Sequence, residues 1–506
     1  MTFTSAGYAL FLPCTALVYY LVPRRLQNAV LLAASCVFYA LNLGGRPLAA
    51  AVLLFHVVFT YLMAQFIAAA EPQKKRGLTA AAVISVLLVL AFFKYYNAFV
   101  PTVLGLADFT HLALPLGISF YTFATVSYLV DVCRGDVPAE RDFIAYAAYV
   151  TFFGTITSGP ICRAREILPQ LRAPRLWDAQ RACDGLRLIL VGLFKWVAVA
   201  NVLGLYVNQI YAALDSYRGL SLIFAAVCYA LELYFEFSGY SEIALGTALI
   251  LGIRIPVNFK TPYFATNFSG FWSRWHISLS NWLQDYIFLP LVWSRWPSRL
   301  PGLGRRLQNP PVLTSVAAVF ILSGFWHGNT WPFVVWGLLQ ALFRVGEELC
   351  HRFFGKPKKH PRAALRVGKS AAVFCLWTVS LVLFRVGLLA HGTVGMAFGA
   401  LARQFTGWSL SAFAAETVAA VESGFYAKPV MVAAYFAFLA PVLALAFFAD
   451  WRQCFRCKDR LIAGELTRLR PAARWAVYYL LLACILAGMI MQSGGFGTVS
   501  FAYAGF

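Results

Sequence analysis

The chain has 506 residues, of which 60% are hydrophobic, 16% are aromatic and only 12% are charged. A water-soluble domain of this size needs far more charge on its surface, so the composition excludes a soluble globular enzyme. Many apolar runs reach the roughly 20 residues that cross a bilayer as a helix. We therefore predict an all-α polytopic membrane protein, because an open sheet would leave backbone groups unpaired in lipid.

The formal net charge of +21 does not indicate a nucleic-acid partner. Lys and Arg gather in loops between apolar segments, which is the pattern of cytoplasmic loops in membrane proteins. Such loops also lie favourably against anionic lipid. We accordingly expect membrane lipid, and no nucleic acid, among the partners.

Apolar runs in the first quarter of the chain predict helices at about 7–22, 27–43, 48–70, 78–99 and 113–132. The charged stretch 71–76 is predicted to be a cytoplasmic turn. The next apolar stretch, 143–161, contains Gly and Pro and has basic residues on both sides. We expect it to dip into the membrane and return, since irregular backbone is tolerated there only when protein or a water-filled cavity shelters it.

Two long helices are predicted next, at about 184–212 and 219–252. The second contains Glu232 and Glu236, which are four residues apart and therefore lie on one helical face. Pairing with cations on neighbouring helices and a proton or substrate role both remain open for these carboxylates.

The insert 254–310 is amphipathic and aromatic, which is typical of a segment that lies in the interface or re-enters the membrane. The run 311–349 is too long for one helix. We expect breaks at Gly324 and at 328–332, giving a hairpin with His327 near its apex. Further helices are predicted at 370–390, 430–449 and 475–492, separated by an external loop (391–428) and a basic loop (452–474).

Polar side chains at membrane depth are costly and therefore suggest function. The insert contains Arg274, His276, Asn281 and Asp285, and His327 stands in an apolar, glycine-containing run. A neutral imidazole can take the proton of a hydroxyl and so activate it as a nucleophile. The sequence lacks a serine elbow, a phosphate-binding loop and a zinc-protease motif, which favours group transfer by histidine and bound substrates. A transporter or flippase, or a non-catalytic scaffold for a secreted enzyme, remains an alternative.

The eleven cysteines are scattered, most of them in apolar segments. Cys454 and Cys457 form one CxxC motif, but a structural zinc site needs four ligands and no second pair lies nearby. We predict no metal site, and the role of this pair stays open.

Several longer motifs of the sequence are similar to those of a known protein family. The chain resembles the membrane-bound O-acyltransferase family, and most of all its bacterial polysaccharide branch. The similar segments are LPLGISFYTFATVSYLVDVCRGD (114–136), TSGPICRAREILPQL (157–171), LVGLFKWVAVAN (190–201), YFEFSGYSEIALG (234–246), NFKTPYFATNFSGFWSRWHISLSNWLQDYIFLPL (258–291), GFWHGNTWPFVVWG (324–337) and the tail SFAYAGF (500–506). Glu236 and Glu242 stand where the family often has Asp, and 292–294 replaces a common Gly-Gly. The polymer is therefore open between alginate, cellulose and another exopolysaccharide.

The resemblance implies a ring of about 11–13 membrane helices with re-entrant segments around a central tunnel. It implies one membrane domain over 1–506, with a core motif region at 114–350 and C-terminal helices at 370–492. In this family, His327 and His276 would be the catalytic residues. The candidates for substrate binding or for the tunnel wall are Arg274, Trp275, Trp326, Asn329, Asn281, Asp285 and Glu236.

For the branch, the expected acyl donor is cytoplasmic acetyl-CoA, with no other cofactor. The expected partners are an extracytoplasmic SGNH-type acetyltransferase and a polysaccharide acceptor. The expected location is the bacterial inner membrane.

Overall fold

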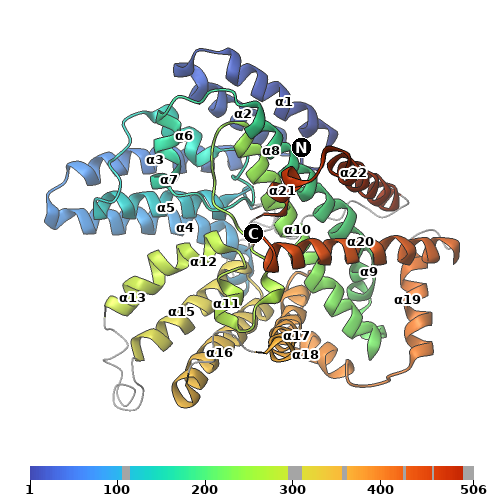
Figure 1. Cartoon of the computed structure of the whole chain (residues 1–506). Helices are drawn as coiled ribbons and strands as arrows, with labels where there is room; N and C mark the ends of the chain where they lie inside the picture. The colour runs from blue at the N-terminus through green and yellow to red at the C-terminus, as the bar shows by residue number, and fades with distance from the viewer. Residues whose placement is uncertain (105–113, 295–309, 356–361, 425–428, 458–460, 494–506) are drawn as a thin grey trace. The chain divides into compact units, whose positions relative to one another are not determined.

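The computed structural model describes residues 1–104, 114–294, 310–355, 362–424, 429–457 and 461–493. Within these ranges the regular structure is helical and contains no strand (Figure 1). Seven of the described helices are long and apolar enough to cross a membrane, and three shorter apolar helices accompany them. The fold is therefore an all-α polytopic membrane protein, as predicted. The count of 11–13 spans and the central tunnel stay predictions.

The described chain divides into two compact units. The first consists of Met1–Ile189 and Tyr240–Val257, and the second consists of Leu190–Gly239 and the residues from Asn258 onward. Helices α8 (Ala179–Leu193) and α10 (Leu220–Ile250) contribute residues to both. The prediction of one domain over 1–506 is not tested by this division and stays a prediction.

Besides its parts of α8 and α10, the described first unit contains seven helices and one short 3-10 turn. They are α1 (Ala6–Leu21), η1 (Arg24–Leu26), α2 (Gln27–Leu41), α3 (Pro47–Ala69), α4 (Pro72–Leu104), α5 (Ile118–Arg134), α6 (Phe143–Thr151) and α7 (Ala164–Arg172). Helices α3, α4 and α5 pack against one another (Figure 1).

Two boundaries in this unit differ from the sequence prediction. The charged stretch 71–76 is not a turn, because α4 already begins at Pro72. Proline suits the first helical position, and the Lys and Arg that follow are good helix formers. Helix α5 begins at Ile118 rather than near 113, because Gly117 adopts a left-handed conformation with φ 72° that no α-helix contains.

The predicted dip at 143–161 contains one helix, α6, of only nine residues. That is roughly half the length that crosses a bilayer. The backbone of 152–163 that follows is non-helical and almost entirely buried. Both observations agree with a re-entrant segment, whose placement in a membrane stays a prediction.

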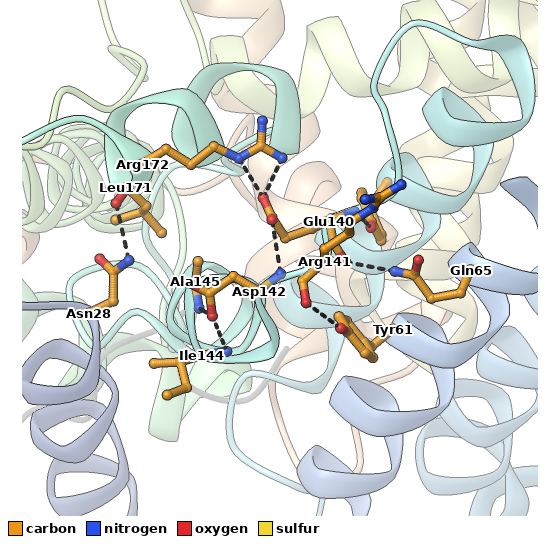
Figure 2. A network of polar contacts seen from close by, with 11 residues as sticks. Asn28, Tyr61, Gln65, Glu140, Arg141, Asp142, Ile144, Ala145, Leu171 and Arg172 are labelled. Carbon is orange, nitrogen blue, oxygen red and sulfur yellow. Dashed lines mark hydrogen bonds and ion pairs between the residues drawn. The ribbon is translucent and has the colours of Figure 1, made fainter. Parts of the chain in front are cut away.

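A polar network fixes the start of this segment (Figure 2). The buried Glu140 carboxylate accepts from the Arg172 guanidinium of α7, with the closer oxygen 2.6 Å from Nη2, and from the Asp142 backbone N–H at 3.1 Å. Its backbone carbonyl accepts from Gln65 of α3 at 2.6 Å. Asp142 in turn caps α6 by accepting from the backbone N–H groups of residues 144 and 145.

Besides its parts of α8 and α10, the second unit contains the remaining described helices. They are η2 (Phe194–Ala200, a π-helix), α9 (Asn201–Ala212), η3 (Leu214–Ser216), η4 (Pro262–Phe264), α11 (Phe268–Trp272), α12 (Ile277–Leu283), η5 (Gln284–Phe288), α13 (Leu289–Trp293), α15 (Pro310–His327), α16 (Trp331–Phe354), α17 (Ala363–Gly387), α18 (Val394–Arg403), α19 (Leu410–Gly424), α20 (Pro429–Phe455), α21 (Ile462–Glu465), η7 (Leu466–Arg468) and α22 (Pro471–Ser493). The predicted long helix at 184–212 thus has a π-helical middle, η2.

The predicted hairpin is present: α15 and α16 pack side by side and turn at 328–330 (Figure 1). The break expected at Gly324 is wrong, because α15 continues through it to His327. The external loop expected at 391–428 contains α18 and α19, and the basic loop 452–474 contains α21 and η7. Residues 295–309 of the predicted insert and the tail 500–506 lie outside the described residues.

Candidate active site

His276 stands in a left-handed turn just before α12, with φ 43°. Such a conformation is uncommon for a residue other than glycine and costs of order 1–3 kcal/mol. Asn258 secures the turn. Its backbone carbonyl accepts from the N–H of Ile277 at 3.0 Å, and its side-chain oxygen accepts from the N–H and the hydroxyl of Ser278 at 3.2 and 2.7 Å.

The same Asn258 oxygen lies 3.3 Å from Nδ1 of His276. Because the Ser278 backbone N–H can only donate, the Asn258 atom facing it is the acceptor oxygen, and Nδ1 of His276 must carry the proton. The basic lone pair then resides on Nε2. The imidazole is 1% exposed and stands edge-on to the Phe237 ring at 4.7 Å. This burial lowers the pKa of His276 to about 3, so the ring is neutral at physiological pH.

His327 is the last residue of α15, at the apex of the hairpin. Its imidazole is 4% exposed and lies among three aromatic rings: Trp326 at 4.6 Å, Phe384 at 5.0 Å and Trp336 at 5.1 Å between ring centroids. Phe384 comes from α17, so three helices enclose this side chain.

Two glycines let α15 and α16 approach closely below His327. A Cβ atom at Gly324 would lie 2.5 Å from the Phe333 carbonyl oxygen and 3.0 Å from Cα of Gly337. Small residues at such crossings allow backbone contact between membrane helices. The glycine contact therefore sets the position of His327.

The structure brings the two predicted catalytic histidines to one place. The indole of Trp326 packs against both, with its ring centroid 4.6 Å from His327 and 6.5 Å from His276. Two buried imidazoles, one of them held in a defined tautomer, thus flank one tryptophan.

Three other predicted residues lie close to His276 in the chain or beside its ring neighbours. Arg274 is half-buried and donates from Nη1 to the Lys260 carbonyl at 3.1 Å. Trp275 is 2% exposed and packs on Trp377 at 5.0 Å, which makes it part of the aromatic core. Glu236 is buried directly before Phe237, the ring that contacts His276.

The three remaining predicted residues have different surroundings. Asn329 is exposed in the hairpin turn, and Asp285 is half-buried in η5. Asn281 is exposed and lines a cleft of about 310 Å³ formed by α11, α12, η5, α15 and α16. The sequence prediction did not distinguish Asn329, Asp285 and Asn281 from the predicted residues that lie beside the two imidazoles.

The cleft contains residues that the sequence prediction missed, among them Trp272, Ser323 and Arg344. Trp272 lies 5.0 Å from the ring of Phe320, which also lines the cleft, and 6.3 Å from Trp336. Trp336 in turn contacts His327, so aromatic rings connect the cleft wall to the imidazole. Arg344 is held by Glu347 at 2.9 Å.

No three His, Cys, Asp or Glu side chains are grouped as a metal site requires, in the part of the chain that the structure describes. Cys457 is buried, and burial raises the pKa of its thiol. These observations leave the role of the CxxC pair open.

The fold is that of a polytopic membrane protein, and two buried imidazoles lie beside one indole within it. The profile of the MBOAT, membrane-bound O-acyltransferase family, matches residues 137–386. The chain is 36% identical to the probable alginate O-acetylase AlgI of Azotobacter vinelandii over 398 residues, which is 76% of this chain and 75% of that protein.

A peptidoglycan O-acetyltransferase of Helicobacter pylori is 31% identical over 66% of this chain and 67% of its own length. A teichoic acid D-alanyltransferase of Bacillus subtilis is 29% identical over 48% of this chain and 60% of its own length. The chain belongs to the membrane-bound O-acyltransferase family, and it is a multi-pass membrane acyltransferase. The sequence-based family assignment and the enzyme class are confirmed.

Proposed function

We propose that this acyltransferase takes an acetyl group from cytoplasmic acetyl-CoA and delivers it across the bacterial inner membrane for O-acetylation of an exopolysaccharide such as alginate or cellulose. The observation that carries the proposal is the 36% identity with a probable alginate O-acetylase over three quarters of both chains. The two adjoining buried imidazoles support it, because O-acetyl transfer needs a neutral base beside the acceptor hydroxyl. An extracytoplasmic SGNH-type acetyltransferase would be the partner that places acetyl on the polymer.

In the proposed reaction, His327 accepts the proton of the acceptor hydroxyl. The oxygen attacks the carbonyl carbon of the thioester, so that a C–O bond forms and the C–S bond breaks. The proton then leaves on the thiolate, which restores the imidazole. His276, neutral and with its basic Nε2 atom defined by Asn258, orients the donor or the acceptor.

Basic residues would bind the acyl donor. Arg274 and the basic loops would hold the phosphates of the donor electrostatically. Substrates would reach the imidazoles through the predicted tunnel. Because the chain is an acyltransferase, the transporter and the non-catalytic scaffold are set aside.

A second acyl group has a specific observation in its favour, since the relative in Bacillus subtilis is a D-alanyltransferase. Its lower identity and coverage make acetyl the better-supported group. The test below uses both donors.

The experiment measures transfer of radiolabel to an added hydroxyl acceptor by the full chain in lipid nanodiscs, with labelled acetyl-CoA or a D-alanyl carrier as donor. His327→Ala is expected to lower acetyl transfer by about 10²–10⁴-fold, which is the usual contribution of a positioned base. The matched control is His391→Ala, at an exposed histidine. Acetyl transfer by His327→Ala at the wild-type rate would remove this residue from the mechanism, and transfer from the D-alanyl donor alone would replace the acetyl assignment.

A further inference from the structure

An apolar groove of about 160 Å³ lies on the second unit, and none of its lining residues belongs to the candidate active site. Its lining comes from the end of α8 and from η2, α20, α21, η7 and α22. On α20, Leu445 and Arg452 are seven residues apart, and Phe448 and Ala449 lie between them at helical spacings of three and four residues from either end. They therefore form one stripe along the helix, which ends in a guanidinium.

The helices that form the groove expose large apolar side chains on the surface of the protein. Only 28% of the apolar window of α20 and 17% of that of α22 is buried within the protein. Phe447 and Phe448 on α20 are 62% and 53% exposed, and Leu480 on α22 is 49% exposed. In a membrane protein such surfaces face lipid chains, so the groove opens to the bilayer rather than to water.

The charges in the groove are unequally compensated. The buried Lys195 faces the carboxylate of Asp450, and Glu465 pairs with Arg468 at 3.0 Å. Arg452 contacts the Cys457 thiol, and no described carboxylate lies within ion-pair distance of it. A guanidinium has five N–H donors, so Arg452 can bind an anion in addition to this contact.

We propose that this groove binds an anionic phospholipid, with one acyl chain along the α20 stripe and the phosphate against Arg452. The apolar stripe matches the acyl chain, and the Arg452 guanidinium, which no described carboxylate pairs with, matches the headgroup phosphate. Two exposed basic residues stand close to the lining in the sequence: Arg456 is one helical turn after Arg452, and Arg470 directly follows Leu469. The proposal does not depend on which acyl group the enzyme transfers.

Native mass spectrometry of the purified full chain in neutral detergent tests the proposal, with phosphatidylglycerol or phosphatidylcholine as the added lipid. Wild type is expected to retain phosphatidylglycerol about fivefold better, the effect of roughly 1 kcal/mol per cation. Arg452→Gln should lose this preference, Arg452→Lys should keep most of it, and Ala449→Phe should lower retention of both lipids by filling the groove. The control is Lys74→Gln, at a side chain 71% exposed, which should behave as wild type.

Equal retention of the two lipids by wild type would overturn the proposal. So would an unchanged preference in Arg452→Gln. Displacement of the retained lipid by millimolar inorganic phosphate would identify the ligand as a soluble anion and would also overturn it. Thermal unfolding of each variant ensures that a loss of lipid is measured on folded protein.

Discussion

The close contact of α15 and α16 at Gly324 predicts that a larger residue there displaces His327. Gly324→Ala would place a Cβ atom 2.5 Å from the Phe333 carbonyl oxygen, which no real Cβ contact tolerates. The helices must therefore separate, and overpacking of this kind costs about 1–3 kcal/mol. That cost changes the ratio of closed to open hairpin by roughly 5- to 150-fold. Since His327 ends α15, acyl transfer should fall together with stability.

Gly346→Ala in α16 is the matched control, because no atom lies within 4 Å of a Cβ built there. It should be neutral, or stabilising by up to about 1 kcal/mol through the higher helix propensity of alanine. Both variants would be compared in nanodiscs by thermal unfolding and by acetyl transfer. If the two variants match in melting temperature and in transfer rate, the close packing does not position His327.

Three further predictions concern single hydrogen bonds and charges. Asn258→Leu removes the acceptor that sets the tautomer of His276, and it should lower kcat by about 10–100-fold with a smaller change in KM; an unchanged kcat would contradict the role of the amide. The unfolded chain protonates histidine near pH 6.5, whereas His276 does so only near pH 3, so the free energy of unfolding should fall as pH is lowered between these values; His276→Gln should show a shallower fall in chemical unfolding, and equal slopes would argue against a neutral buried ring. Arg172→Gln leaves the buried Glu140 carboxylate without its cation and should destabilise the first unit by about 1–3 kcal/mol, while the exposed Arg141→Gln should not; equal melting temperatures for the two variants would rule this out.

Much of the helix order could be predicted because long apolar runs need no tertiary information. The hairpin followed from the length of 311–349 and from the turn residues after His327. Gly324 was misjudged as a break for a physical reason. Glycine is a poor helix former in water, but inside a membrane protein its lack of a side chain permits the contact with Gly337.

The helices α18 and α19 were missed because charge placement reports the side of the membrane, not the local conformation. The stretch 391–428 has few basic residues, which indicated an external loop. Thr393 nevertheless caps α18 by accepting from the N–H of Met396 at 3.2 Å, a signal that an amphipathic helix begins there.

The candidate site was predictable in its residue types but not in its supports. His276 and His327 stood out because imidazoles in apolar surroundings are unusual. Asn258 did not, since its importance depends on a left-handed turn that brings it beside residues 276–278. Trp326 contacts the imidazoles of both His276 and His327. This contact depends on how two separate elements pack, which the helical periodicity of the sequence does not reveal.

The three aromatic side chains around His327 have a consequence for folding during synthesis. Its neighbours Trp326 and Trp336 belong to the hairpin, but Phe384 lies near the end of α17. In a nascent chain that has not yet emerged beyond α17, His327 lacks its contact with Phe384. The ribosome must therefore deliver α17 before the imidazole acquires its final environment, and fragments that stop earlier would hold His327 without the ring of Phe384 beside it.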